Sequence, residues 1–257
     1  MPGIPILDQS LPQQIFVFML LFTRIGAMMM VFPGTGEAFV SARFRLGLAL
    51  AVSFVLMAPL MPRIPALPSD TGQLILLVGL EALIGLAIGT AARLLISSLN
   101  VAGNVIAVQT GLGFALSVDP SQGQHGAIVA TFLTTLGVLM IFTTGAHALL
   151  FSALVRSYDL FPVGAAPSTA DFLELIVRFI SGSFALGIEL TVPFLVLSLV
   201  FYAGLGVVSK MMPQFQVFFI SMPLSIMAGF AMLMVLIGTM LEIFLDRFGQ
   251  AFGEFAR

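Results

Sequence analysis

The sequence predicts an all-α, polytopic membrane protein. Hydrophobic residues make up 59% of its 257 residues and charged residues only 9%, whereas soluble domains carry about 25% charged residues. The mean hydropathy of +1.13 is also high for a protein with a water-facing surface. The apolar runs are long and continuous, unlike the roughly ten-residue alternating segments of a membrane β-barrel. We therefore expect helices that lie in a membrane.

About six apolar segments follow one another along the chain. They cover residues 15–32, 46–60, 74–95, 127–154, 173–205 and 217–245. A simple membrane-spanning helix needs about 20 apolar residues, so the second segment is short and the fourth and fifth are long. These lengths favour broken or irregular helices that pack mainly on other protein, although uncertain segment boundaries would give the same pattern. We expect residues 1–257 to form a single membrane-embedded domain without a separate soluble domain.

A polar stretch interrupts the apolar pattern between the third and fourth segments. Residues 103–120 read GNVIAVQTGLGFALSVDP. Non-helical backbone at membrane depth is tolerated only where protein buries it or where it lines a wet cavity, and polar groups at that depth are costly. The stretch is therefore the main candidate for a functional segment. The alternative is an ordinary polar turn between two helices.

Three charged side chains, Arg24, Glu81 and Glu189, lie in or beside apolar segments. One interpretation is a proton or cation site, as in a secondary transporter. The other is a carboxylate that pairs with an arginine such as Arg24, Arg93 or Arg178, or that faces a wet interior. The second interpretation is favoured, because no acidic cluster occurs at helical spacing.

Gly85 and Gly89 form a GxxxG pair within the third segment. Small residues four positions apart let two helices approach closely. The pair therefore predicts a partner helix, which could belong to this chain or to another subunit.

Several classes of function are excluded by composition. The chain has no Cys, so thiol catalysis, disulfides and thiolate metal sites are absent. His125 and His147 are its only two histidines, and no HExxH, GxSxG, Walker or GxGxxG pattern occurs. The net charge of −2 gives no basic field for nucleic acid. We expect no enzyme activity, no metal, no cofactor and no nucleic acid partner.

Four stretches in order resemble the FliR family, the R component of the flagellar type III protein-export gate. The first is EALIGLAIG at residues 81–89, and the second is the run at residues 103–120. The third is the G-x-H and P-x-G pattern within residues 145–164, and the fourth is KMMPQFQVF at residues 210–218, followed by a Pro-Leu pair. Each stretch alone is weak, but their order and spacing cover nearly the whole chain. The gate protein of virulence injectisomes is a relative.

The resemblance implies a subunit of an export gate in the bacterial inner membrane, at the flagellar basal body. Such subunits assemble with the P and Q gate proteins, and contact with the B-type export switch protein is also implied. Unfolded flagellar proteins pass through the channel that the assembly surrounds. The odd lengths of the apolar segments fit this expectation, because much of the surface would pack on neighbouring subunits.

The resemblance also implies roles for individual residues. The loop over residues 109–122 is expected to project into the closed channel as a plug, and its glycines would give the backbone freedom to fold aside. The expected plug residues are Gln109, Gly111, Gly113, Phe114, Ser117, Asp119, Pro120 and Gln122. The residues expected in helix packing or at a subunit interface are Gly85, Gly89, Pro213 and Gln214.

Two rival functions remain at this point. An autonomous secondary transporter of a small solute would need Glu81 or Glu189 and would work without partners. A purely structural scaffold would tolerate changes in the plug loop but not at Gly85 or Gly89.

Overall fold

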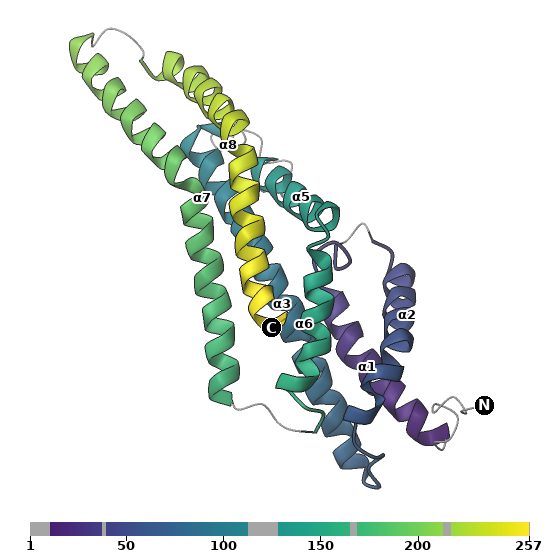
Figure 1. Cartoon of the computed structure of the whole chain (residues 1–257). Coiled ribbons are helices and arrows are strands. Elements are labelled where there is room, and N and C mark those ends of the chain that lie inside the picture. The colour runs from purple at the N-terminus through teal and green to yellow at the C-terminus, as the bar shows by residue number, and fades with distance from the viewer. Residues whose placement is uncertain (1–10, 38–39, 113–127, 165–168, 213–216, 257) are drawn as a thin grey trace. The chain divides into compact units, whose positions relative to one another are not determined.

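A computed structural model describes residues 11–37, 40–112, 128–164, 169–212 and 217–256, and within them all regular structure is helical (Figure 1). The predicted all-α fold is therefore confirmed. In chain order the helices are α1 (Leu11–Val31), α2 (Ala42–Leu60), the short 3-10 helix η2 (Met61–Arg63), α3 (Thr71–Gln109), α5 (Ile128–Thr143), α6 (His147–Leu160), α7 (Thr169–Met211) and α8 (Val217–Ala256).

The helices have the irregular lengths that the apolar segments predict. In the described residues, five are long and apolar enough to cross a membrane, and the bent pair α5–α6 would give a sixth span. α3, α7 and α8 have 39, 43 and 40 residues. At 1.5 Å per residue each is roughly 60 Å long, about twice the thickness of a bilayer's hydrocarbon core. Length alone therefore shows that these three are not simple spans.

Local sequence explains where several helices begin and break. Ser41 caps α2 by accepting a hydrogen bond from the amide of Phe44 at 3.3 Å. Asp70 caps α3 in the same way, because its carboxylate accepts a hydrogen bond from the amide of Gln73 at 3.2 Å. The fourth apolar segment is divided between α5 and α6 by a 73° bend, and Gly145 in this break has a φ of +77° that favours glycine.

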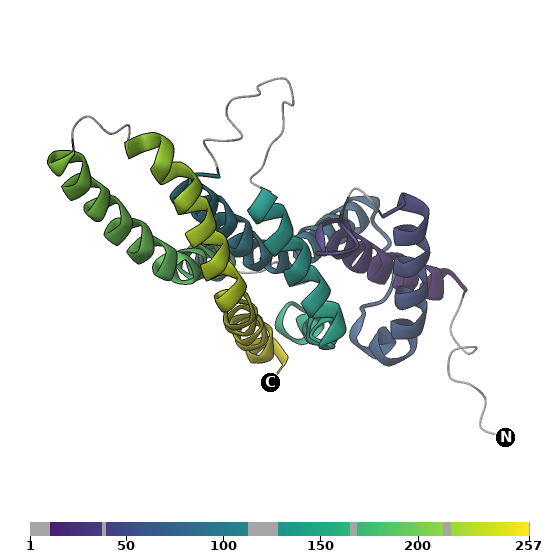
Figure 2. The same cartoon turned by 90° about the horizontal axis from the view of Figure 1, so that it is seen from above.

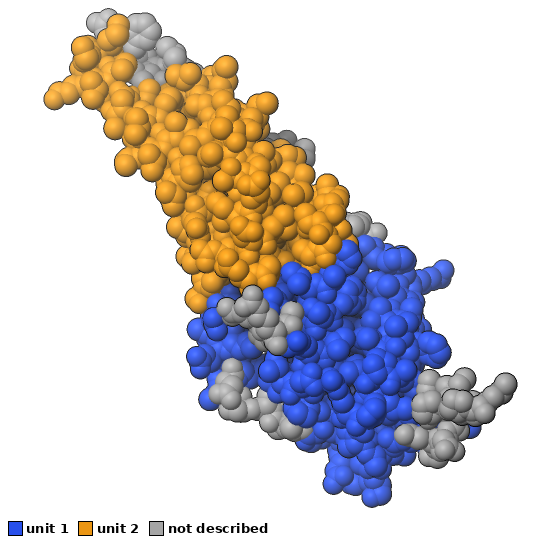
Figure 3. Space-filling model, in the orientation of Figure 1, with its two compact units in different colours: residues 1–94, 147–179, 251–257 blue, residues 95–146, 180–250 orange. Residues whose placement is uncertain are grey.

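The chain forms two compact units (Figure 3). Unit 1 comprises Met1–Leu94, His147–Phe179 and Ala251–Arg257, and unit 2 comprises Leu95–Ala146 and Ile180–Gln250. α3, α7 and α8 each contribute residues to both units, so neither unit is a continuous stretch of sequence.

In unit 1 the most buried helix is α1. Its buried side chains recur at helical spacing and include Val17, Leu20, Leu21 and Ile25, all fully inaccessible. The aromatic ring of Phe32, just beyond α1, packs on Phe151 of α6 with ring centroids 6.2 Å apart. The other elements of unit 1 therefore pack around α1.

In unit 2, residues 95–109 of α3 pack against α5, α7 and α8. Leu99 is fully buried, and its side chain lies so close to Gly137 of α5 that an added Cβ there would overlap it. Gly187 of α7 also lies close to α3, since an added Cβ there would come within 3.1 Å of Val101 and 3.2 Å of the Ser98 carbonyl oxygen. Beyond this core, the second half of α7 and the first half of α8 run in opposite directions in both views (Figures 1 and 2).

Candidate functional site

The two charges nearest the centre of unit 1 form a buried ion pair. Arg24 of α1 donates through Nε to one carboxylate oxygen of Glu81 at 2.6 Å and through Nη2 to the other at 2.8 Å. The Arg24 side chain is 0% exposed and that of Glu81 is 1% exposed. Such a two-point contact is the geometry in which a guanidinium binds a carboxylate most strongly.

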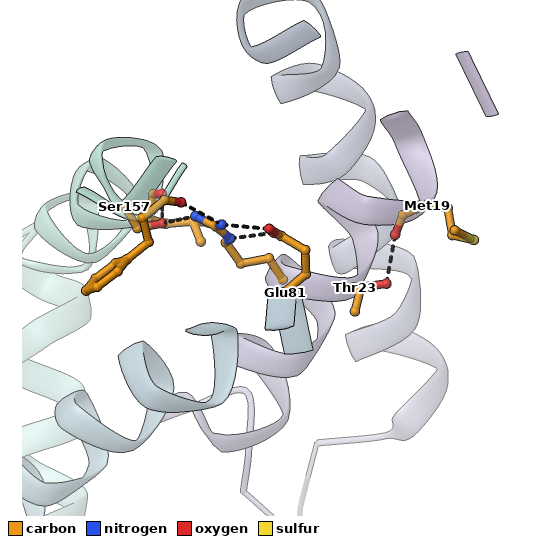
Figure 4. A network of polar contacts seen from close by, with 7 residues as sticks. Met19, Thr23, Glu81 and Ser157 are labelled. Carbon is orange, nitrogen blue, oxygen red and sulfur yellow. Dashed lines mark hydrogen bonds and ion pairs between the residues drawn. The ribbon is translucent and has the colours of Figure 1, made fainter. Parts of the chain in front are cut away.

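The Arg24 guanidinium also forms hydrogen bonds with α6 and the residue that follows it. Nη1 donates to the Ser157 hydroxyl at 2.9 Å, and Nη2 donates to the carbonyl of Phe161 at 3.0 Å, just beyond the end of α6. The ring of Tyr158 lies under the guanidinium, 3.8 Å from centroid to Cζ, at a distance typical of a cation–π contact. In Figure 4 the guanidinium nitrogens lie between Ser157 and Glu81. Arg24 therefore ties together three elements of unit 1.

The pairing resolves an alternative that the sequence left open. Arg24, and not Arg93 or Arg178, is the partner of Glu81. Both carboxylate oxygens of Glu81 accept hydrogen bonds from the guanidinium, as expected of an ion pair with a structural role. Within the described part of the chain, no three His, Asp or Glu side chains converge as metal ligands.

Gly85 and Gly89 have their packing partner within the chain. An added Cβ at Gly85 would overlap the carbonyl oxygen of Arg24, and one at Gly89 would meet the carbonyl oxygen of Met28. Glu81, Gly85 and Gly89 lie four residues apart and therefore share one face of α3. That face packs on α1, so the GxxxG pair and the ion pair form one continuous contact.

The third predicted intramembrane charge, Glu189, lies in unit 2 and has a different partner. Its carboxylate accepts from Nη2 of Arg247 on α8 at 3.1 Å. The two side chains are 47% and 52% exposed. This ion pair is thus about half accessible, unlike the buried pair in unit 1.

The polar stretch begins later in the structure than the sequence pattern indicates. Residues 103–109 continue α3 as regular helix. Gly111 then takes a φ of +78°, the left-handed conformation that ends helices at glycine. Gln109 and Thr110 lie against α7 and α8, where a small cleft is lined by Gln109, Thr110, Phe194, Leu197, Ser198, Phe201, Ser225 and Ala228.

Most of the other predicted loop residues lie outside the described part of the chain. These are Gly113, Phe114, Ser117, Asp119, Pro120 and Gln122, together with Pro213 and Gln214 between α7 and α8. Their roles stay predictions.

Sequence reasoning missed two groups of residues that the structure brings together. Ser157 and Tyr158 contact Arg24 from 133 and 134 positions away, and no short-range pattern signals such a contact. Thr110 lies directly against Gly229 of α8, and only the glycine itself could have suggested a close approach at that point.

Comparisons with known proteins identify the family. The family described as "Bacterial export proteins, family 1" matches residues 15–251. The Flagellar biosynthetic protein FliR of Caulobacter vibrioides is 39% identical over 237 residues, covering 92% of this chain and 94% of that protein. The proteins of the same name from Bacillus subtilis and Escherichia coli are each 29% identical, covering 85% and 83% of this chain and 85% and 81% of their own lengths.

The match extends over nearly all of both units, and it agrees with the helical membrane architecture. The residues that carried the resemblance lie within the matched range. The chain therefore belongs to family 1 of the bacterial export proteins and, within it, to the FliR family, as a membrane component of the flagellar export apparatus.

Proposed function

We propose that this chain is a subunit of the flagellar type III export gate and that it helps to form and seal the channel for unfolded flagellar proteins. It would do so in the bacterial inner membrane at the flagellar basal body, as one membrane-embedded domain. Its partners would be the P and Q gate subunits, with the B-type export switch protein as a further contact. No catalysis and no cofactor enter this proposal.

The observation that carries the sealing role is the place where α3 ends. Gln109 and Thr110 line a small cleft with apolar and serine residues of α7 and α8 in unit 2, and the chain turns at Gly111 directly afterwards. In the sequence, the polar residues up to Gln122 therefore follow a point at which α3 lies against α7 and α8. A polar segment that starts there suits a plug in a water-filled channel, because lipid would not tolerate it.

The surface of unit 2 supports a role within an assembly. Large apolar side chains are exposed along both α7 and α8, among them Leu199, Val200, Met227, Met234 and Val235. Helices packed on neighbouring subunits would cover such residues. The lengths of α7 and α8 also suit protein packing better than a simple span.

The transporter alternative finds less support in the geometry. Glu81 is fully engaged by Arg24 and buried, so it offers no free carboxylate to a passing ion. Glu189 is accessible but already paired with Arg247.

Deleting residues 113–122 tests the sealing role while leaving the described end of α3 in place. The variant would be expressed in cells that lack their own R component, and passive loss of the membrane potential would be measured. We expect a leak in cells whose tagged chain still co-purifies with the P and Q subunits. A variant that assembles normally in a tight membrane would contradict the sealing role and favour the scaffold.

A further inference from the structure

Two asparagines lie side by side on the surface of unit 2. Asn100 and Asn104 are one helical turn apart on α3, and both are exposed. By contrast, large apolar side chains such as Leu199 are exposed along α7 and α8 in the same unit. Leu99 and Ala102, next to the asparagines in the sequence, are fully buried. α3 therefore packs through a different face, and its packing does not require an asparagine at either position.

Hydrogen bonds within α3 fix how the two carboxamides are oriented. Nδ2 of Asn104 donates to the backbone carbonyl of Asn100 and to its side-chain Oδ1, both at 2.9 Å. The group that faces two oxygens has to be the donor, so Oδ1 of Asn104 is directed away from them. Among the residues that the structure describes, neither Oδ1 of Asn104 nor Nδ2 of Asn100 has a hydrogen-bond partner. The pair thus presents one free acceptor and one free donor.

The chemistry of this pair determines what can cover it. Lipid tails offer neither donor nor acceptor, so lipid leaves both groups unsatisfied. A polypeptide main chain offers both, because each residue other than proline carries one N–H and one C=O. Side chains four residues apart on a helix are about 5–6 Å apart. In an extended chain, groups on the same side recur every second residue, or about every 6.6 Å. The spacing of the pair therefore suits an extended main chain.

We infer that the face of α3 that carries Asn100 and Asn104 is part of the channel wall and binds the main chain of an extended polypeptide in transit. The inference rests on the proposed export function and adds the surface and the chemical group that it recognises. Main-chain binding does not depend on side chains, so one pair serves substrates of different sequence. Val108, one turn further along the same row and 68% exposed, gives the passing side chains an apolar contact.

Disulfide crosslinking locates the passing chain, because the protein has no native cysteine. Asn100→Cys and Asn104→Cys are each combined with an export substrate that has one cysteine in its unfolded part and stops in the gate at a fused, stably folded domain. Val235→Cys, at an exposed apolar position of α8, is the matched control. We expect both asparagine positions to crosslink to the arrested substrate, at several successive cysteine positions along it, and Val235→Cys to give background only.

The export rate separates binding from mere proximity. Asn100→Leu with Asn104→Leu removes the free donor and the free acceptor, and leucine favours a helix more than asparagine does, so α3 should stay folded. Asn100→Gln with Asn104→Gln keeps both carboxamides. Export is divided by the amount of P and Q subunits that co-purify. We expect several-fold slower export with the leucine pair and a rate close to wild type with the glutamine pair.

The outcomes distinguish this inference from the proposed function. Wild-type export by the leucine pair would overturn main-chain binding, and lower recovery of P and Q subunits with that pair would make the face a subunit contact instead. If Gln109→Cys crosslinks to the arrested substrate while the two asparagine positions do not, the chain still lines the channel and only this inference is wrong. If the substrate crosslinks to P or Q but to no position of this chain, the channel-forming role is wrong and the inference is overturned with it.

Discussion

At the scale of single residues, the buried pair of Arg24 and Glu81 should behave as a unit. Arg24→Met leaves the Glu81 carboxylate buried without a counter-charge, which costs about 3–5 kcal/mol in comparable buried pairs. The double variant Arg24→Met with Glu81→Met leaves no buried charge, and replacing both partners by apolar residues is often close to neutral. We expect a large fall in the thermal unfolding midpoint in detergent for the single variant and a substantial recovery for the double.

Glu189→Gln provides the matched control for the buried pair. It breaks an ion pair that is about half exposed, so it leaves no charge enclosed by the protein without a counter-charge. A small shift is expected in the unfolding midpoint.

Motility restored by the double variant Arg24→Met with Glu81→Met would argue against a transporter that depends on Glu81. A stable but immotile double variant would favour such a transporter.

The sequence could identify these charges but not their network. Arg24 and Glu81 stand out because ionised groups are rare in apolar segments. Their pairing was one of several possibilities, since the two residues are 57 positions apart. Ser157 and the Phe161 carbonyl have no distinguishing pattern, because they matter only once α6 packs beside α1.

At the scale of helices, the α1–α3 contact depends on the absence of side chains at two positions. Gly89→Ala places a methyl group against the backbone of Met28, and Gly85→Ala does so against that of Arg24. Backbone cannot move aside as a flexible side chain can, and overpacking of this kind costs about 1–3 kcal/mol. We expect both variants to unfold at lower temperature in detergent.

Gly79→Ala is the control for this prediction, because it lies on the same helix and its Cβ would enter open space. It should leave the unfolding midpoint unchanged or raise it slightly, because alanine favours a helix over glycine by about 1 kcal/mol. Wild-type stability of Gly85→Ala would show that α1 and α3 are not in the close contact described here.

Helix boundaries were the least predictable feature at this scale. α3 continues to Gln109 although polar residues begin near Gly103, and one of those residues satisfies its side-chain amide donor along the helix itself. The Asn104 amide donates to the backbone carbonyl and to the side-chain oxygen of Asn100, both at 2.9 Å. The fourth apolar segment breaks into α5 and α6 although it contains no charge. Hydropathy detects neither effect, since one depends on side-chain hydrogen bonds and the other on a glycine turn.

At the scale of the whole molecule, the sequence predicted an all-α membrane protein, and the structure and the family match confirm it. Composition sufficed for that, because so few charges cannot cover a water-facing surface. The division into two units could not be read from the chain, since each unit is built from separate stretches joined by tertiary packing. What covers the exposed apolar face of α8 is likewise a property of the assembly.

The last prediction concerns that face. Met227 and Met234 are seven residues apart and both exposed, so they lie on the same side of α8. If neighbouring gate subunits cover them, Met227→Ala with Met234→Ala removes contacts between proteins. If lipid covers them, the change costs little, because lipid tails fill the space with equally apolar groups. We expect several-fold less P and Q subunit to co-purify with the double variant, at an unchanged level of the chain itself.

Met240→Ala is the comparison that makes this result interpretable. Met240 of α8 is buried inside this chain, so its truncation should lower the unfolding midpoint of the chain, at a cost of about 2–5 kcal/mol. The two variants therefore separate loss of partners from loss of internal packing. Equal recovery of the P and Q subunits with the wild-type chain and the Met227/Met234 variant would mean that this face of α8 meets lipid, and the subunit contacts would have to lie on another exposed face of the chain.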